Sequence, residues 1–431
     1  MRKIEMSGQI TPALVAELLP RAAVSIESVA DTVSQIIAEV RQNSLDALDA
    51  QAERFDGLKN VSFRVPKTVL AEALNQLDAP LRAAIETAIT RVRAVSMATM
   101  PTAVRVELDE GAIVEQLFIP VDSVGLYVPG GKAVYPSSVV MNVVPAQVAK
   151  VPRIAVSSPA QENGLPSPSV MATCALLGID EVYGIGGASA IAAFAYGVPE
   201  INLEPVAMVT GPGNIFVAAA KRQLRGVIGI DSEAGPTEIL IVADESANPR
   251  FIAADLISQA EHDQNAAAVL VTDSASLIEE VQAELEVQVS LAKNRDRIEA
   301  SLGGVQSALV LVPDMSTAMA VANEYATEHL EIQTANSKEL AGQVRHAGAV
   351  FVGAYSPVSL GDYLAGSNHV LPTGQQAKFS SGLSVFTFLR TQQHVTYSAD
   401  ALAAVTDRLR VFSEAEKLSA HGRAGSIRLG E

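Results

Sequence analysis

The chain has 431 residues, a formal net charge of −17 and a hydrophobic content of 48%, with few aromatic residues. This length is typical of two or three domains, and the negative charge argues against a nucleic-acid partner, whose phosphates would be repelled. No apolar run reaches the roughly 20 residues that span a bilayer, the first residues contain no signal-peptide core, and a single cysteine excludes an internal disulfide. We therefore expect a cytoplasmic protein that binds neither nucleic acid nor membranes.

The first part of the chain has the apolar spacing of helices. Apolar residues recur every three or four positions in 11–22, 28–57 and 66–98, which predicts helices there, and Asp56-Gly57 closes the second one. The pattern changes to strand character in 111–131, which ends in a glycine pair.

Alternating strands and helices dominate the middle of the chain. Valine- and isoleucine-rich runs alternate with alanine-rich helical stretches from about 124 to 242, and the runs "AAAVLVT" and "SALVLVP" continue this rhythm. Such a βαβ pattern predicts an α/β fold with doubly wound parallel sheets. After about 386 the strand pattern fades, and the tail is predicted to form one or two helices with little core of their own.

Three glycine-rich loops are candidates for binding a cofactor, at 128–138, 184–197 and 209–224. The second should follow a strand and open a helix, as a dinucleotide-binding loop does, but Ser189 replaces the third glycine of that motif. Each loop alone is equally compatible with a tight strand–helix turn. Three of them in one βαβ segment favour a phosphate-bearing ligand, because glycine backbones and helix N-termini bind anions.

The histidines lie apart from these loops, since all six fall between 262 and 421. Gln259 and His262 are three residues apart on a predicted helix and share a face, so they could be metal ligands or only a solvated helix end. Glu328 and His329 are adjacent, which suits acid–base chemistry. Asp362 and His369 share one loop, as ligand and substrate contact or as turn residues. Cys174 sits on an apolar helix face and is predicted to be a core residue, which leaves no thiol nucleophile.

Several ordered stretches resemble the histidinol dehydrogenase family, and the resemblance runs from the N-terminal helices to about residue 428. The similar stretches are "VGLYVPGGKAVYPSSVVMNVVPA", "VTGPGNIFVAAAKRQ", "DSEAGPTEIL", "DLISQAEHDQNA", "YATEHLEIQT", "SLGDYLAGSNHVLPT" and "AEKLSAHGRA". The family oxidises L-histidinol to L-histidine through L-histidinal, the last steps of histidine biosynthesis, with two NAD⁺ and a zinc ion.

The resemblance implies two Rossmann-like doubly wound domains with small helical extensions at both ends. Four parts are expected: an N-terminal helical extension at 1–25, a discontinuous α/β domain with the zinc and catalytic residues at 26–126 and 238–385, an NAD-binding α/β domain at 127–237, and a helical tail at 386–431. In the family the tail reaches the partner subunit of a homodimer, so the active sites are expected to be shared.

The resemblance also implies roles for single residues. The expected zinc ligands are Gln259, His262, Asp362 and His421, which would contact the substrate as well. The expected acid–base pair is Glu328 and His329, with further substrate contacts from Thr237, His369 and Glu416 and NAD contacts from Tyr127, Ser189 and Asn214. The family commonly has Gln at the position of Ser189, which implies a lost or water-mediated hydrogen bond to the nucleotide. Many members have Ser at the position of Thr237, where the hydroxyl is kept.

The chemistry of histidinol agrees with these roles. Its imidazole and amine could chelate Zn²⁺, and because zinc does not change oxidation state, a separate acceptor such as NAD⁺ must take the hydride. His329 is the expected base for the hydroxyl proton, and Glu328 is expected to activate water for the aldehyde step. Three alternatives stay open: a relative that oxidises another small alcohol, a zinc hydrolase using Glu328 and metal-bound water, and an NAD-binding scaffold without catalysis.

Overall fold

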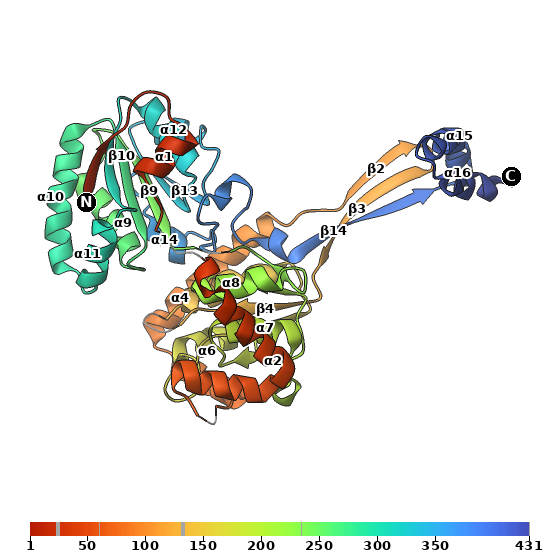
Figure 1. The fold of residues 1–431 in the computed structure, drawn as a ribbon, viewed down its shortest axis with the longest axis horizontal. Helices are drawn as coiled ribbons and strands as arrows, with labels where there is room; N and C mark the ends of the chain where they lie inside the picture. The colour runs from red at the N-terminus through yellow and green to blue at the C-terminus, as the bar shows by residue number, and fades with distance from the viewer. Residues whose placement is uncertain (23–25, 60, 131–133, 234, 431) are drawn as a thin grey trace.

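The computed structural model describes residues 1–22, 26–59, 61–130, 134–233 and 235–430. Two lobes, each built on a parallel sheet, lie next to each other, and a long arm projects away from them (Figure 1). Within the described residues, no helix is long and apolar enough to cross a membrane.

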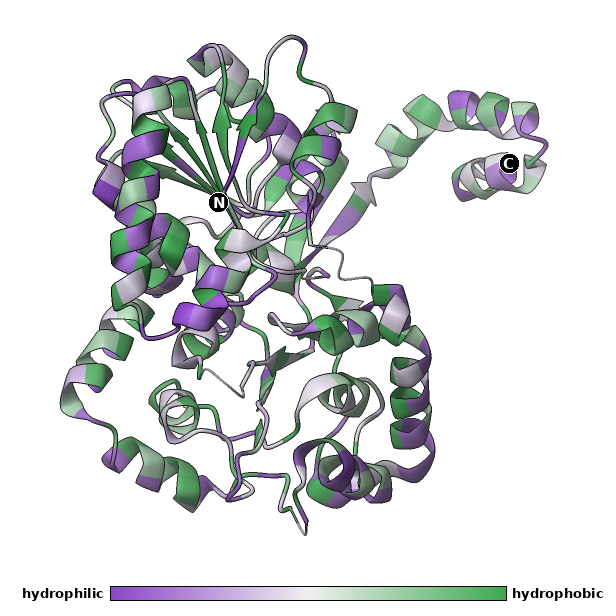
Figure 2. Ribbon diagram, turned by 60° about the vertical axis from the view of Figure 1, so that its left-hand side comes forward, coloured by the Kyte–Doolittle hydropathy of each residue, from purple (hydrophilic) through white to green (hydrophobic). Residues whose placement is uncertain are grey.

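The first lobe contains a six-stranded sheet in which every pairing is parallel, in the order β1-β11-β10-β9-β12-β13. Its strands are β1 (Arg2–Glu5), β9 (Glu238–Ala243), β10 (Ala267–Thr272), β11 (Ala308–Leu311), β12 (His329–Gln333) and β13 (Ala349–Val352). Strands buried on both faces should be apolar throughout, and Figure 2 shows the strands of this sheet as mainly hydrophobic. One face packs on α1 (Pro12–Leu18), α12 (Met315–Tyr325) and α13 (Ser337–Ala341). The other packs on α9 (Pro249–Ala260), α10 (Ala275–Leu291), α11 (Arg295–Gly303) and α14 (Val358–Tyr363).

The second lobe contains a five-stranded parallel sheet in the order β6-β5-β4-β7-β8. Its strands are β4 (Ser123–Tyr127), β5 (Arg153–Ser157), β6 (Val182–Tyr183), β7 (Met208–Thr210) and β8 (Gly229–Ile230). One face is covered by α3 (Lys67–Asn75), α4 (Ala79–Ala98), α5 (Pro136–Val148) and α6 (Pro168–Leu176). The other is covered by α2 (Ala30–Gln51), α7 (Gly187–Tyr196) and α8 (Ile215–Leu224).

Both sheets have the strand order of a Rossmann-like doubly wound fold. In each lobe the first strand of the βαβ series, β4 or β9, lies at the centre, and the order reverses beside it. The predicted fold class of parallel α/β sheets is therefore confirmed.

The arm is a three-stranded antiparallel sheet in the order β14-β3-β2, followed by two helices at its tip (Figure 1). It consists of β2 (Val104–Asp109), β3 (Ala112–Pro120), β14 (Leu389–Tyr397), α15 (Ala399–Ala415) and α16 (Ser419–Ser426). Every residue of β2 is exposed, and so are eight of the nine residues of β14. The described residues also contain short helical segments, which are η1 (Ile26–Val29), η2 (Ala52–Asp56), η3 (Pro199–Ile201), η4 (Gln376–Lys378), η5 (Val385–Phe388) and η6 (Ile427–Leu429).

Three expectations about the organisation of the chain need correction. The segment 1–25 contains a helix but begins with a strand, β1, which pairs with β11. The tail after 386 begins with a strand, β14, before its helices. The helices of 26–126 pack mainly on the five-stranded sheet and not on the sheet formed by 238–385, because the apolar faces of α2, α3 and α4 belong to the cores of the second lobe. From 238–385, Val370 and Leu383 join one of these cores, and Arg91 of α4 donates a hydrogen bond to the carbonyl of Leu364.

Candidate active site

A cavity of about 530 Å³ lies between the two lobes and gathers most of the predicted site residues. Loops at the carboxyl ends of the strands line it on the side of the second lobe, including the segment from Gly211 to Ile215 after β7. On the side of the first lobe, the amino ends of β9 and β12 contribute Thr237, Glu328 and His329. The predicted residues that line this cavity are Asn214, Thr237, Gln259, His262, Glu328, His329, Asp362 and His369.

The predicted acid–base pair is formed at the start of β12. The preceding helix α12 ends where Ala326 adopts a left-handed backbone with φ of 50°, which turns the chain toward the cavity. Both side chains of the pair are almost fully buried, and Nδ1 of His329 lies 3.5 Å from Oε2 of Glu328. Burial alone would lower the pKa of His329, but the Glu328 carboxylate, with help from Asp362 and the Glu238 carbonyl, raises it to about 9.

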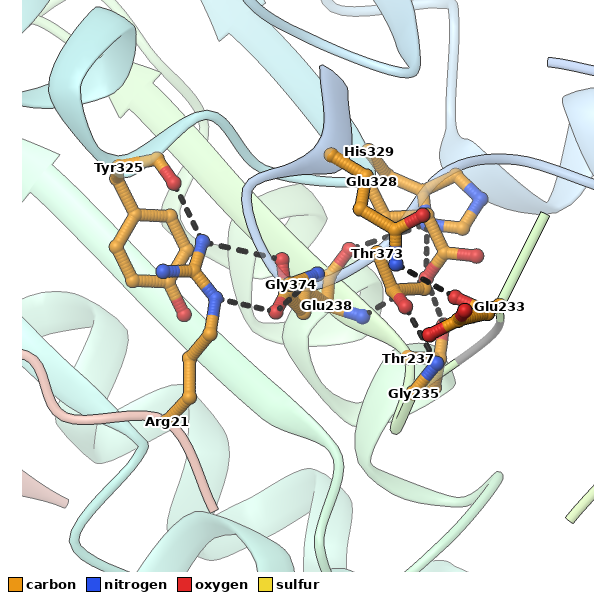
Figure 3. Close-up of polar contacts among 11 residues, drawn as sticks. Arg21, Glu233, Gly235, Thr237, Glu238, Tyr325, Glu328, His329, Thr373 and Gly374 are labelled. Atoms are coloured by element: carbon orange, nitrogen blue, oxygen red, sulfur yellow. Dashed lines mark hydrogen bonds and ion pairs between the residues drawn. The ribbon is translucent and has the colours of Figure 1, made fainter. Parts of the chain in front are cut away.

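Glu328 is held by hydrogen bonds that leave its position well defined. Its Oε2 accepts a hydrogen bond from Oγ1 of Thr237 at 2.5 Å and another from the backbone N–H of Glu238 at 2.9 Å. Thr237 in turn accepts a hydrogen bond from the amide of Gln259. Thr237, predicted as a substrate contact, thus also links Glu328, a member of the predicted acid–base pair, to Gln259, a predicted metal ligand. Figure 3 shows the contact between Thr237 and Glu328.

His369 is held with a defined ring orientation beside the cavity. Its Nδ1 donates to the backbone carbonyl of Asp362 at 2.9 Å, and its Nε2 lies 3.0 Å from Oγ of Ser138 on α5. Burial lowers the pKa of His369, which favours the neutral ring. Ser138 therefore connects the second lobe to a loop of the first, and the sequence had not singled it out.

Three of the four predicted zinc ligands face the same cavity. Gln259 lies in the last turn of α9, and His262 follows just after the helix ends, so the two are closer to a helix terminus than predicted. Asp362 comes from α14. Within the described part of one chain, no three histidine, cysteine or acidic side chains are arranged to hold a metal ion.

The predicted tail residues are not brought to this cavity within one chain. His421 lies in α16 and Glu416 ends α15, and both are exposed at the tip of the arm, away from the lobes (Figure 1). The cavity can therefore contain all the predicted residues only if another subunit supplies its tail or if the arm takes a different position.

A second cavity, of about 860 Å³, lies over the second lobe and is lined by all three predicted NAD contacts. The loop at 184–187 follows β6 and opens α7 as predicted, but β6 is an edge strand and not the first strand of the series. The hydroxyl of Tyr127 accepts a hydrogen bond from the Gly187 N–H at 3.0 Å, and burial raises the pKa of Tyr127 to about 12. The predicted loop at 128–138 includes residues 131–133, which lie outside the described residues.

The other two predicted NAD residues have hydrogen bonds within the protein. Oγ of Ser189 donates to Oε1 of Gln51 at 2.7 Å, and Oδ1 of Asn214 caps α8. Asn214 lines both cavities, as does Pro129, so the two cavities adjoin. Gln51 of α2 was not predicted, because nothing in its local sequence distinguishes it from other helical glutamines.

Comparison with known proteins gives one family. The family model described as histidinol dehydrogenase matches residues 19–429. The chain is 52% identical over 434 residues to the histidinol dehydrogenase of Leifsonia xyli subsp. xyli, with 100% of both chains covered. It is 55% identical to that of Thermobifida fusca, covering 99% of this chain and 97% of the relative.

A solved structure agrees with these matches. The crystal structure of histidinol dehydrogenase from Elizabethkingia anophelis superposes with a TM-score of 0.94 at 29% identity, covering 99% of this chain and 98% of that one. With a family model over nearly its whole length and relatives at about half identity, the chain belongs to the histidinol dehydrogenase family of oxidoreductases, which act in histidine biosynthesis.

Proposed function

We propose that this protein oxidises L-histidinol to L-histidine through L-histidinal, with zinc and with reduction of two NAD⁺. The observation that carries the proposal is the buried Glu328–His329 pair in a cavity that also presents Gln259, His262 and Asp362. The adjoining cavity of about 860 Å³ offers space for a dinucleotide and shares Pro129 and Asn214 with the cavity that contains the pair. The family membership supports a nicotinamide cofactor in general terms.

The direct test is absorbance at the reduced-nicotinamide band after mixing the protein with zinc, NAD⁺ and histidinol. We expect two reduced nicotinamides for each histidinol consumed, and none when either histidinol or NAD⁺ is omitted. If another small amino alcohol is oxidised faster than histidinol, that alcohol and not histidinol is the substrate. Product formation without any nucleotide would support the zinc hydrolase instead.

The donor set fits zinc by its chemistry. An amide oxygen, an imidazole nitrogen and a carboxylate oxygen are all ligands that this ion accepts. Among the described residues, neither the imidazole of His262 nor the carboxylate of Asp362 has a hydrogen-bond partner, so both are available. His421 would supply the fourth protein donor. When bound, zinc would fix the substrate's imidazole and amine and polarise its hydroxyl.

Replacing His262 by Asn should therefore remove zinc and activity while the fold is kept. The exposed position of His262 means that no core packing is lost. The measurement is metal content by mass spectrometry after dialysis, with the circular dichroism melting curve as a check on folding. Full histidinol oxidation by verified zinc-free protein would contradict the assignment.

The residues of this chain suggest how protons move. Both neighbours of Nδ1 of His329 are acceptors, the Glu238 carbonyl and the Glu328 carboxylate, so Nδ1 carries a hydrogen and Nε2 is the basic nitrogen. His329 would take the hydroxyl proton as hydride leaves to NAD⁺. Glu328 would remove a proton from the water that adds to histidinal. His369, and Glu416 from a tail, would contact the substrate.

Alcohol oxidation should accelerate as the pH rises toward about 9. His329 acts as a base only in its neutral form, and its pKa in the folded protein is about 9. The check is a pH profile of kcat/KM for histidinol in zinc-loaded enzyme. A profile already flat above pH 7 would show that the base has a lower pKa and would argue against His329.

We also propose that each active site combines the lobes of one subunit with the tail of another. The arm carries exposed apolar side chains on its strands and tip helices, including Val106, Val395 and Phe412, the last of them 71% exposed. Such a surface needs a partner. A two-fold homodimer would provide two equivalent shared sites.

A further inference from the structure

The backbone of one residue, Glu238, contacts both members of the predicted acid–base pair. Its N–H donates to Oε2 of Glu328 at 2.9 Å, and its carbonyl accepts from Nδ1 of His329 at 3.1 Å. Glu238 is the first residue of β9, and its neighbour Ile239 pairs with His329 on β12. The position of this one peptide segment therefore sets the positions of both functional groups.

The side chain of Glu238 is buried, and Arg21 holds it. Only 3% of the residue is exposed. Nε of Arg21 donates to Oε1 at 2.5 Å and Nη2 donates to Oε2 at 3.3 Å, while the Gly374 N–H also donates to Oε1 at 3.2 Å (Figure 3). Burial raises the pKa of Glu238, and the Arg21 charge opposes that shift. Without Arg21, a carboxylate would be left buried and unpaired, which is costly.

Arg21 also reaches the segment that leads into the acid–base pair. Its Nη2 donates to the carbonyl of Tyr325, and its guanidinium lies 4.1 Å from the centre of the Tyr325 ring. Tyr325 is the last residue of α12, three residues before Glu328. The guanidinium of Arg21 is thus hydrogen-bonded both to the first residue of β9 and to the last residue of α12, just before the turn that leads into β12. Arg21 is not among the residues that line the cavity, so it acts only through others.

We propose that Arg21 is a positioning residue of the active site, which fixes Glu328 and His329 through the side chain of Glu238 and the carbonyl of Tyr325. The inference rests on the proposed roles of Glu328 and His329. It assigns a function to the segment after α1, whose contribution would otherwise be only structural.

The test compares Arg21→Met with wild type. Methionine keeps an apolar stem beside Tyr325 but removes the charge and every hydrogen bond. We expect kcat for histidinol to fall about 10- to 100-fold, because small displacements of reacting groups cost that much. KM for histidinol and NAD⁺ should stay within about twofold. The double variant R21M/E238Q should recover part of the lost kcat, since no buried charge is left unpaired.

The matched control is Arg153→Met. Arg153 forms a two-bond pair with Glu181, with Nη2 to Oε1 at 2.6 Å, and its side chain is 25% exposed against 21% for Arg21. The pair lies in the second lobe and lines neither cavity. We expect R153M to lower the melting temperature and leave kcat unchanged. Equal losses of kcat in R153M and R21M, or an unchanged kcat in folded R21M, would overturn the proposal.

A second readout does not depend on turnover. Nitrogen-15 labelling of the six histidines allows the His329 ring to be followed by NMR during a pH titration. Loosening the contact with Glu328 should move its midpoint down by at least about half a pH unit in R21M but not in R153M. An unchanged midpoint in R21M would overturn the proposal even if wild-type protein fails to oxidise histidinol, a failure that would reject only the proposed function.

Discussion

Replacing Glu328 by Gln should slow the oxidation of histidinal far more than the oxidation of histidinol. Only the aldehyde step needs activated water, and loss of a general base costs about 10²- to 10⁴-fold. The amide of glutamine keeps an acceptor for Thr237 and for the Glu238 N–H, so the local structure should persist. The alcohol step should lose less than about tenfold when it is measured about one unit above pH 9, where His329 is mostly neutral in either protein.

His329→Ala is the companion variant, and it should slow both steps. The measurement is single-turnover formation of reduced nicotinamide, started separately from histidinol and from histidinal. Equal losses on the two substrates in the Glu328 variant would count against separate roles for the two residues. An unimpaired His329→Ala enzyme would remove the base from the mechanism.

Mixing two inactive variants should restore about a quarter of wild-type activity. His421→Asn damages only the tail, and Glu328→Gln damages only the lobes, so each pure dimer should be nearly inactive in the conversion of histidinol to histidine. Random exchange makes about half of the dimers mixed. In each mixed dimer, one site pairs an intact tail with intact lobes, and the other carries both lesions, so about one site in four is complete.

The control is native mass spectrometry to show that subunits have exchanged. Complete exchange without recovered activity would mean that each tail serves its own lobes, and would reject shared sites. Because His421 is exposed, its substitution should leave the fold intact, and a melting curve of the variant checks this directly.

The sequence predicted those parts of the fold whose signals are local. Strands such as β9 and β10 are continuous apolar runs because helices cover both faces. Their neighbouring helices begin at side chains that cap them, for example Asn248 before α9 and Asp314 before α12. The contact between Glu328 and His329 was predictable because the two residues are adjacent in the chain, while their role as an acid–base pair stays a prediction.

The parts that were not predicted depend on contacts between distant segments. β14 contains mostly polar residues and has no buried face, so no apolar alternation marks it as a strand. β1 is only four residues long, and its strand structure depends on β11. Arg21 and Glu238 are 217 positions apart. Glu238 stands at the start of the apolar run 238–243, where a buried position is expected, and this acid could have indicated that a basic side chain pairs with it.

The strand pairing of the arm has a consequence for the order of folding. β2 and β3 are joined by a tight turn at Glu110-Gly111, so that hairpin can form early. β14 pairs with β3 across the segment between Pro120 and Leu389, and closing so long a loop costs on the order of 5 kcal/mol. If both lobes pack first, they bring Pro120 and Leu389 close together, and the free energy of packing offsets the cost of closing the loop. The tip helices would then be placed last. If the proposed sharing of sites between subunits holds, the recovery of activity after denaturation should depend on protein concentration, because the final event would be an encounter between two nearly finished subunits.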